Sequence, residues 1–127
     1  MIADHIGAWP TQCYFNCRRA IQKLDDYAQA SYVEGFAASQ WGCFEHGWIV
    51  RDGQIIELTL DLDLDVAYFA GLEFKGRAGI AEFLATPLGR GCKRTAFFTA
   101  FGMFGGESAS FALARADAMK HFITGGA

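Results

Sequence analysis

Several features that mark particular classes of protein are missing from this sequence of 127 residues. No apolar run approaches the roughly 20 residues that a membrane-spanning helix needs. The first five residues, MIADH, show neither the basic region nor the apolar core of a signal peptide. No block of basic residues occurs and the net charge is −3, so nucleic-acid binding has little electrostatic support. We therefore expect a cytosolic protein that binds neither membranes nor nucleic acids.

The chain also lacks internal repeats, linkers and low-complexity tracts, which predicts one domain over residues 1–127. That length suffices for a hydrophobic core. Apolar residues make up 52% of the sequence, which argues against disorder, and the 12 phenylalanines predict an aromatic-rich core. Because disulfides are rare in the cytosol, the four cysteines are expected to be thiols.

A hairpin is predicted within residues 45–60, where two apolar, β-rich runs flank Asp52-Gly53. This dipeptide accepts the positive φ angles of a type I′ turn, which joins two strands through a two-residue loop. Such a loop fixes the register, so that Val50 faces Ile55. The turn chemistry therefore sets which side chains of the two strands lie opposite one another.

Continuing this register puts Trp48 opposite Glu57 and His46 opposite Thr59. Because side chains alternate along a strand, these four residues would share one face. His46 and Glu57 would be diagonal neighbours about 7 Å apart at their Cα atoms, a gap that two long side chains can close. A carboxylate that holds an imidazole in one tautomer is half of a catalytic triad.

A thiol near the start of the first helix is a candidate for the other half. Apolar residues recur every three or four positions from about residue 12 to residue 30, which predicts a helix with Thr11 as its N-cap. Cys13 falls in the first turn, where unpaired backbone N–H groups and the helix dipole favour a thiolate. Cys17 falls on the apolar stripe and is expected in the core.

The other predicted elements complete an α+β fold, in which the helix that carries Cys13 packs on a small antiparallel sheet and a helix ends the chain. They are strands at residues 31–38 and 66–74, a short helix at 78–85, a buried strand at 95–104 and a final helix at 107–122. The inward positions expected for the final helix are Phe111, Leu113, Ala114, Met119 and Phe122. The alternating aspartates of residues 61–65 are expected to form a solvated acidic edge.

The order of a cysteine at a helix start, a histidine on a strand and a carboxylate on the next strand resembles that of transglutaminase-like and papain-like cysteine enzymes. Four blocks are also similar to those of a group of small bacterial and phage proteins: residues 12–16 (QCYFN), 32–37 (YVEGFA), 46–48 (HGW) and 55–59 (IIELT). Those proteins carry Cys-Tyr-x-Asn, Tyr-Val-Glu-Gly-Tyr, His-Ala-Trp and Asp-Pro-Thr blocks, and a Tyr-Phe-Gly segment similar to residues 68–71 here. The resemblance spans residues 12–74 and implies the fold and the triad.

The sequence departs from this pattern at two positions. Glu57 stands where the resemblance implies Asp, and Leu58 stands where it implies Pro. The additional methylene of Glu57 changes the geometry with which a carboxylate meets His46.

The function that these residues predict is cysteine-dependent hydrolysis or acyl transfer at an amide, isopeptide or thioester bond. Cys13 would attack the carbonyl, His46 would act as the general base and acid, and Glu57 would orient His46. The substrate would be a peptide or another amide-containing molecule, with proteins included among the candidates. This chemistry needs no cofactor.

Three further residues have expected supporting roles. Gln12 would donate to the oxyanion beside the backbone N–H of Cys13, although an ordinary polar residue of a first turn is the more common case. Trp48 is expected to pack in the core and to shield the imidazole. Glu34 lies between apolar residues, so either a hydrogen-bonded structural role or support of the site is expected.

Two alternatives compete with the enzyme. One is a small zinc-stabilised domain, because Cys13 and Cys17 lie one helical turn apart and Cys43-x-x-His46 offers two further ligands. The other is a non-catalytic binding module of the same fold, from a phage or plasmid, that occupies a host partner. The sequence leaves the substrate, the pathway and the oligomeric state open.

Overall fold

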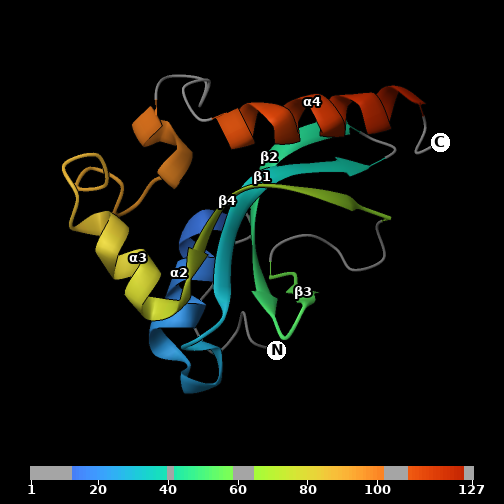
Figure 1. Ribbon diagram of the computed structural model, residues 1–127. Helices are drawn as coiled ribbons and strands as arrows, with labels where there is room; N and C mark the ends of the chain where they lie inside the picture. Colours follow the sequence, from blue (N-terminus) through green and yellow to red (C-terminus); the bar gives the residue numbers. More distant parts are fainter. Residues whose placement is uncertain (1–12, 40–41, 59–64, 102–108, 125–127) are drawn as a thin grey trace.

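The computed structural model describes residues 13–39, 42–58, 65–101 and 109–124, without the side chains of residues 122–124. Its helices are α2 (Cys13–Lys23), α3 (Gly76–Leu84) and α4 (Ala109–Thr124), with the 3-10 helices η1 (Asp25–Tyr27) and η2 (Phe97–Phe101). The strands β1 (Ser31–Ser39), β2 (Gly42–Arg51), β3 (Gln54–Ile56) and β4 (Ala67–Lys75) form one antiparallel sheet in the order β3-β2-β1-β4 (Figure 1). The predicted α+β fold, with a helix at each end, is therefore confirmed. No helix of the described ranges has the length and apolar character to cross a membrane.

The predicted hairpin is confirmed in its turn and, over the three residue pairs that β2 forms with β3, in its register. Asp52 and Gly53 have φ angles of 52° and 76°, as a type I′ turn requires. Val50 pairs with Ile55, and β3 ends one residue before Glu57. The predicted pairing of His46 with Thr59 lies outside the described residues.

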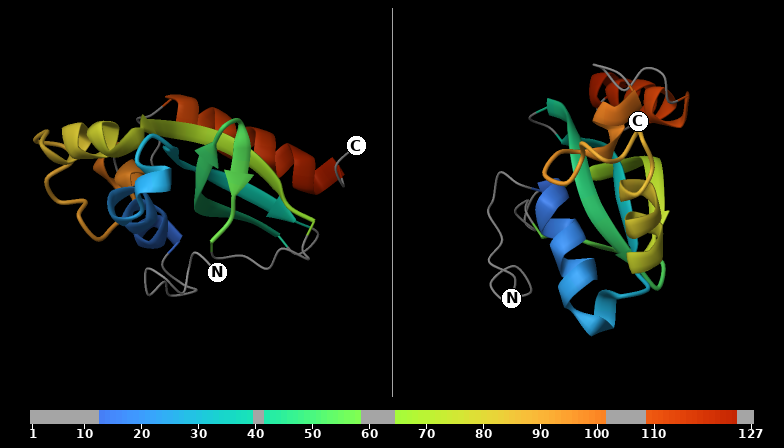
Figure 2. Two further views of the ribbon diagram at one scale, coloured as in Figure 1. Left: turned by 90° about the horizontal axis from the view of Figure 1, so that it is seen from below. Right: turned by 90° about the vertical axis from the view of Figure 1, so that its left-hand side faces the viewer.

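One face of the sheet packs against the helices. Tyr32 on β1 joins a core cluster with residues of α2, α3 and η2, whereas Phe36 and Ala38 join a second cluster with residues of α4. Because these residues alternate along β1, both clusters cover the same face. Figure 2 shows α4 running along the sheet while α2 and α3 lie together at its other end.

The opposite face of the sheet carries a different set of side chains. On β1, Val33 pairs with Trp48, and Ala37 pairs with Tyr68 of β4. His46 pairs with Gly35 and therefore shares this face with Trp48. The sequence prediction that His46 and Trp48 lie on one face is confirmed by the pairing of β1 with β2.

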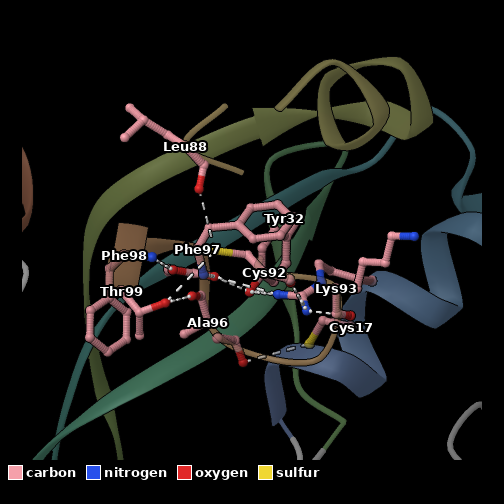
Figure 3. Close-up of polar contacts among 12 residues, drawn as sticks. Cys17, Tyr32, Leu88, Cys92, Lys93, Ala96, Phe97, Phe98 and Thr99 are labelled. Atoms are coloured by element: carbon pink, nitrogen blue, oxygen red, sulfur yellow. Dashed lines mark hydrogen bonds and ion pairs between the residues drawn. The ribbon is translucent and has the colours of Figure 1, made fainter. Parts of the chain in front are cut away.

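The segment predicted as a strand at residues 95–104 bonds to a buried carboxylate instead of to a neighbouring strand. This prediction is wrong over residues 97–101, which form η2. The N–H groups of Phe97 and Phe98 both donate to the Glu34 carboxylate, at 2.5 and 2.7 Å. Successive N–H groups of a strand point to opposite sides, so two that meet one carboxylate require a turned backbone. Figure 3 shows Phe97 beside Tyr32, whose hydroxyl group also donates to Glu34.

The first helix is shorter than the predicted range of residues 12–30. It ends at Lys23, because Leu24 is extended (φ −101°, ψ 117°), and η1 follows. Arg77 donates from Nε to the carbonyl oxygen of Ile21 at 2.6 Å. This bond satisfies one of the carbonyl groups that a helix end leaves free. The expected N-cap, Thr11, lies outside the described residues.

The final helix has a narrower buried stripe than the sequence predicted. Phe111, Ala114 and Ala118 are buried at spacings of three and four residues. Leu113 and Met119 are 66% and 49% exposed, so their predicted inward orientation is wrong. Both point away from the buried stripe of α4, in which two of the three residues are alanines. The side chain of Phe122 lies outside the described part of the chain.

Candidate active site

The cysteine that the sequence singled out begins α2, and the first turn of this helix lies against β2. The ring of Tyr14 packs so closely on Gly47 that a Cβ at Gly47 would lie 2.8 Å from it. One turn later, the Cys17 thiol donates to the carbonyl oxygen of Gly47 at 3.6 Å. Because Gly47 follows His46, these contacts bring the start of α2 beside the histidine. Cys17 is fully buried, as predicted.

His46 connects the two other predicted triad members. Its Nε2 atom lies 2.8 Å from Oε1 of Glu57. The side chain of Cys13 also lies close enough to the ring to raise the pKa of His46. Since Nε2 faces Glu57, Nδ1 is the ring nitrogen available to the thiol. Cys13, His46 and Glu57 are therefore neighbours in the structure, with His46 between the other two.

The surroundings of His46 favour its charged form. Burial of the ring lowers its pKa, since only 2% of the residue is exposed. The hydrogen bonds to Cys13 and Glu57 and the charges of these groups act in the other direction and outweigh burial. The pKa of His46 is raised to about 9. At neutral pH the histidine is therefore an imidazolium between a carboxylate and a sulfur atom.

Aromatic rings surround the histidine on its own face of the sheet. The Trp48 ring stacks on it with centroids 6.1 Å apart, and the Tyr68 ring lies at 6.3 Å. Trp48 and Tyr68 also meet edge to face at 5.0 Å. Phe44, two residues before His46 on β2, contacts the imidazole edge to face, with ring centroids 5.8 Å apart. Trp48 is buried, so its expected packing in the core is confirmed, whereas its expected role as a shield of the imidazole stays a prediction.

Tyr68 is the residue that sequence reasoning missed. Its hydroxyl group donates a hydrogen bond of 2.7 Å to Oε1 of Glu57, the same oxygen that faces His46. The only sequence signal was the similarity of residues 68–71 to a Tyr-Phe-Gly segment. Residue spacing could not have placed Tyr68 there, since β4 reaches this point only through its pairing with β1.

The other supporting residues have separate outcomes. Glu34 is fully buried, accepts hydrogen bonds from Phe97 and Phe98, and lies 3.8 Å from a guanidinium nitrogen of Arg18. Of its two expected roles, the structural one is therefore shown. Gln12 and its proposed oxyanion contact lie outside the described residues.

The zinc alternative has no geometric support. The described residues include all four of its proposed ligands, Cys13, Cys17, Cys43 and His46. Among these described residues, no three His, Cys, Asp or Glu side chains gather as a metal-binding group. The Cys17 thiol is engaged with the Gly47 carbonyl, and His46 faces Glu57. All four cysteines of the chain are free.

The raised pKa of His46 predicts how stability depends on pH. Folding favours the protonated ring, so this contribution is complete below the ordinary pKa of 6.5 and is lost as the pH rises through about 9. Each pKa unit corresponds to about 1.4 kcal/mol. We expect the free energy of unfolding, measured with urea, to fall between pH 6.5 and pH 9, and to fall less in Glu57→Gln. An equal slope in the two proteins would contradict the contribution of Glu57 to this pKa shift.

Comparison of the chain with family models, with curated proteins and with solved structures finds no match. The resemblance to transglutaminase-like and papain-like enzymes therefore stays a prediction, and what supports a function for this chain is the geometry of Cys13, His46 and Glu57.

Proposed function

We propose that the protein is a cysteine-dependent hydrolase or acyltransferase that acts on an amide, isopeptide or thioester bond. One observation carries the proposal: a single buried imidazole contacts both the Glu57 carboxylate and a thiol at the start of a helix. A histidine held for structural reasons needs a partner for its ring nitrogens, but not a partly exposed cysteine. The two contacts together are what a nucleophile and its base require.

The reaction begins when the Cys13 thiolate attacks the substrate carbonyl carbon. The electron pair of the C=O bond moves to oxygen, and the backbone N–H of Cys13, in the first turn of α2, donates to this oxyanion. Collapse of the intermediate expels the leaving group, which takes the proton of the His46 imidazolium. An S-acyl cysteine remains.

Neutral His46 then completes the cycle as a base. It takes a proton from water, or from an acceptor amine or alcohol, whose oxygen or nitrogen attacks the S-acyl carbonyl. Collapse of the second intermediate releases the acyl product and restores the thiolate beside the imidazolium. Glu57 stays ionised throughout and stabilises the charged ring. A cytosolic location fits this chemistry, because a reducing compartment keeps the thiol free.

Selective alkylation tests the nucleophile. We expect iodoacetamide at pH 6 to modify Cys13 first, because a thiolate paired with an imidazolium reacts at a pH where ordinary thiols are protonated. Cys43 is the matched control, since it is also partly exposed and burial raises its pKa. Peptide mapping by mass spectrometry identifies the site. Preferential labelling of Cys43 or Cys92 would overturn the assignment.

Acylation distinguishes the enzyme from a binding module of the same fold. With p-nitrophenyl acetate, an activated ester, we expect a burst of one nitrophenolate per chain and an acetyl group on Cys13. The burst should be absent in Cys13→Ala and preserved in Cys43→Ala. Efficient alkylation of Cys13 without any acylation would show a reactive thiol that performs no acyl transfer, and would overturn the proposed function.

A further inference from the structure

We infer that Tyr68 is a positioning residue, which holds the Glu57 carboxylate in the orientation that pairs it with His46. The Tyr68 hydroxyl and the His46 Nε2 meet the same oxygen atom, Oε1, at 2.7 and 2.8 Å. For its catalytic meaning this inference rests on the proposed function. It also makes a prediction about His46 that is independent of any reaction.

Glu57 lies just beyond a short edge strand, where a contact to another strand adds to what fixes its side chain. It follows the last residue of β3, a strand of only three residues at the edge of the sheet. A glutamate side chain also has three rotatable bonds, which cost free energy to fix. The Tyr68 hydroxyl, which comes from a different strand than His46, restrains the same carboxylate oxygen from a second direction.

Tyr68 can reach Glu57 because β1 places only small residues between them. Tyr68 pairs with Ala37 on β1, and the next residue of β1 on that face is Gly35. A Cβ at Gly35 would overlap the carbonyl oxygen of Phe69, so β1 and β4 meet here only with glycine. No bulky side chain of β1 therefore separates the ring of Tyr68 from Trp48 and His46, which it contacts.

The Tyr68 hydroxyl is fixed as a donor. Burial, the hydrogen bond to Glu57 and the charge of that carboxylate all raise the pKa of Tyr68 far above its ordinary value. The phenol therefore keeps its proton at neutral pH, and Glu57 accepts from it. Cys13 on α2, Glu57 just after β3 and Tyr68 on β4 are the titratable groups that face His46 from neighbouring segments.

The test replaces Tyr68 with phenylalanine, which removes the hydroxyl group and keeps the ring. If Tyr68 positions Glu57, the carboxylate spends less time on His46, and the His46 pKa measured by NMR should fall by about one unit. Alkylation of Cys13 at pH 6 should then slow about tenfold, because one pKa unit is a tenfold change in ionisation. If the Tyr68 hydroxyl instead only weakened the negative charge of Glu57, its removal would strengthen the pairing with His46 and raise the His46 pKa. An unchanged or higher His46 pKa therefore overturns the inference.

Tyr32→Phe is the matched control. It also removes a tyrosine hydroxyl that donates to a buried glutamate, here Glu34 on the helix-covered face. It should lower the unfolding midpoint but leave the His46 pKa and Cys13 alkylation unchanged. In a Glu57→Gln background, where no carboxylate remains to be positioned, Tyr68→Phe should not shift the His46 pKa further. The His46 pKa is measured without the thiol reaction. An unreactive Cys13 would therefore overturn the proposed function, while the test of Tyr68 would remain valid.

Discussion

Replacing Glu34 with glutamine is expected to lower the free energy of unfolding by about 3 to 5 kcal/mol, the cost of breaking a buried charge network. Both carboxylate oxygens are occupied. Oε1 accepts from the Phe98 N–H at 2.7 Å, and Oε2 accepts from the Phe97 N–H and from the Tyr32 hydroxyl. A glutamine amide has one oxygen and one NH₂ group. In either orientation, the NH₂ group faces a backbone donor and leaves it without an acceptor in the core.

The substitution also leaves a buried cation without its anion. Arg18 lies 3.8 Å from Glu34, and its other nitrogen donates to the carbonyl oxygens of Cys92 and Lys93 at 3.1 and 3.2 Å. The pKa of Glu34 is raised on balance, because burial outweighs the hydrogen bonds and the Arg18 charge that lower it. The carboxylate and guanidinium together attach residues 92–98 to β1 and α2. We therefore expect the loss to be cooperative rather than confined to one hydrogen bond.

Urea unfolding followed by circular dichroism measures this loss, with Glu73→Gln as the control. Glu73 is an exposed carboxylate on β4, so its replacement should change the free energy of unfolding by less than about 0.5 kcal/mol. In native Glu34→Gln protein, the pH at which Cys13 becomes reactive should be unchanged. A stable Glu34→Gln with altered Cys13 ionisation would mean that Glu34, and not Glu57, serves the thiol.

The sequence predicts the fold best where a local signal sets the geometry. Asp52-Gly53 fixes the hairpin and its register, because few residues accept two successive positive φ angles. The prediction of a strand fails for residues 97–101, because this segment is as apolar as a buried strand but forms η2. The determinant of η2 is the Glu34 carboxylate, 63 residues earlier than Phe97, and no periodicity in a short window reports such a partner. Tertiary contacts override local propensity here.

The candidate site divides in the same way. The contact between His46 and Glu57 follows from the hairpin register, so counting residues from the turn was sufficient to predict it. Tyr68 joins them across β1, and its position depends on the pairing of β4 and on the irregularity beside Gly35. A sequence read in local segments has no access to that pairing. The contact of Tyr68 with Glu57 can therefore be identified from the structure but not from the sequence.

Replacing Glu57 with glutamine is expected to raise the pH at which Cys13 reacts by about one to two units, so that alkylation at pH 6 slows by about 10- to 100-fold. Glutamine keeps the size of the side chain and an oxygen that can accept from His46 and Tyr68. It removes the negative charge that helps to raise the His46 pKa to about 9. A less basic imidazole stabilises the neighbouring thiolate less, whereas the fold loses little.

Thiolate absorbance near about 240 nm, followed against pH, measures this shift, and Cys13→Ser supplies the baseline because it removes the thiol. Glu57→Asp should lie between the wild type and Glu57→Gln: it keeps the charge, but its shorter side chain cannot meet both His46 and Tyr68 at their present distances. This ranking separates charge from reach, since a purely steric role would make the shorter aspartate the worse replacement. A titration that is the same in wild type and Glu57→Gln would show that the carboxylate beside His46 does not support the thiol, and the proposed triad would reduce to Cys13 and His46.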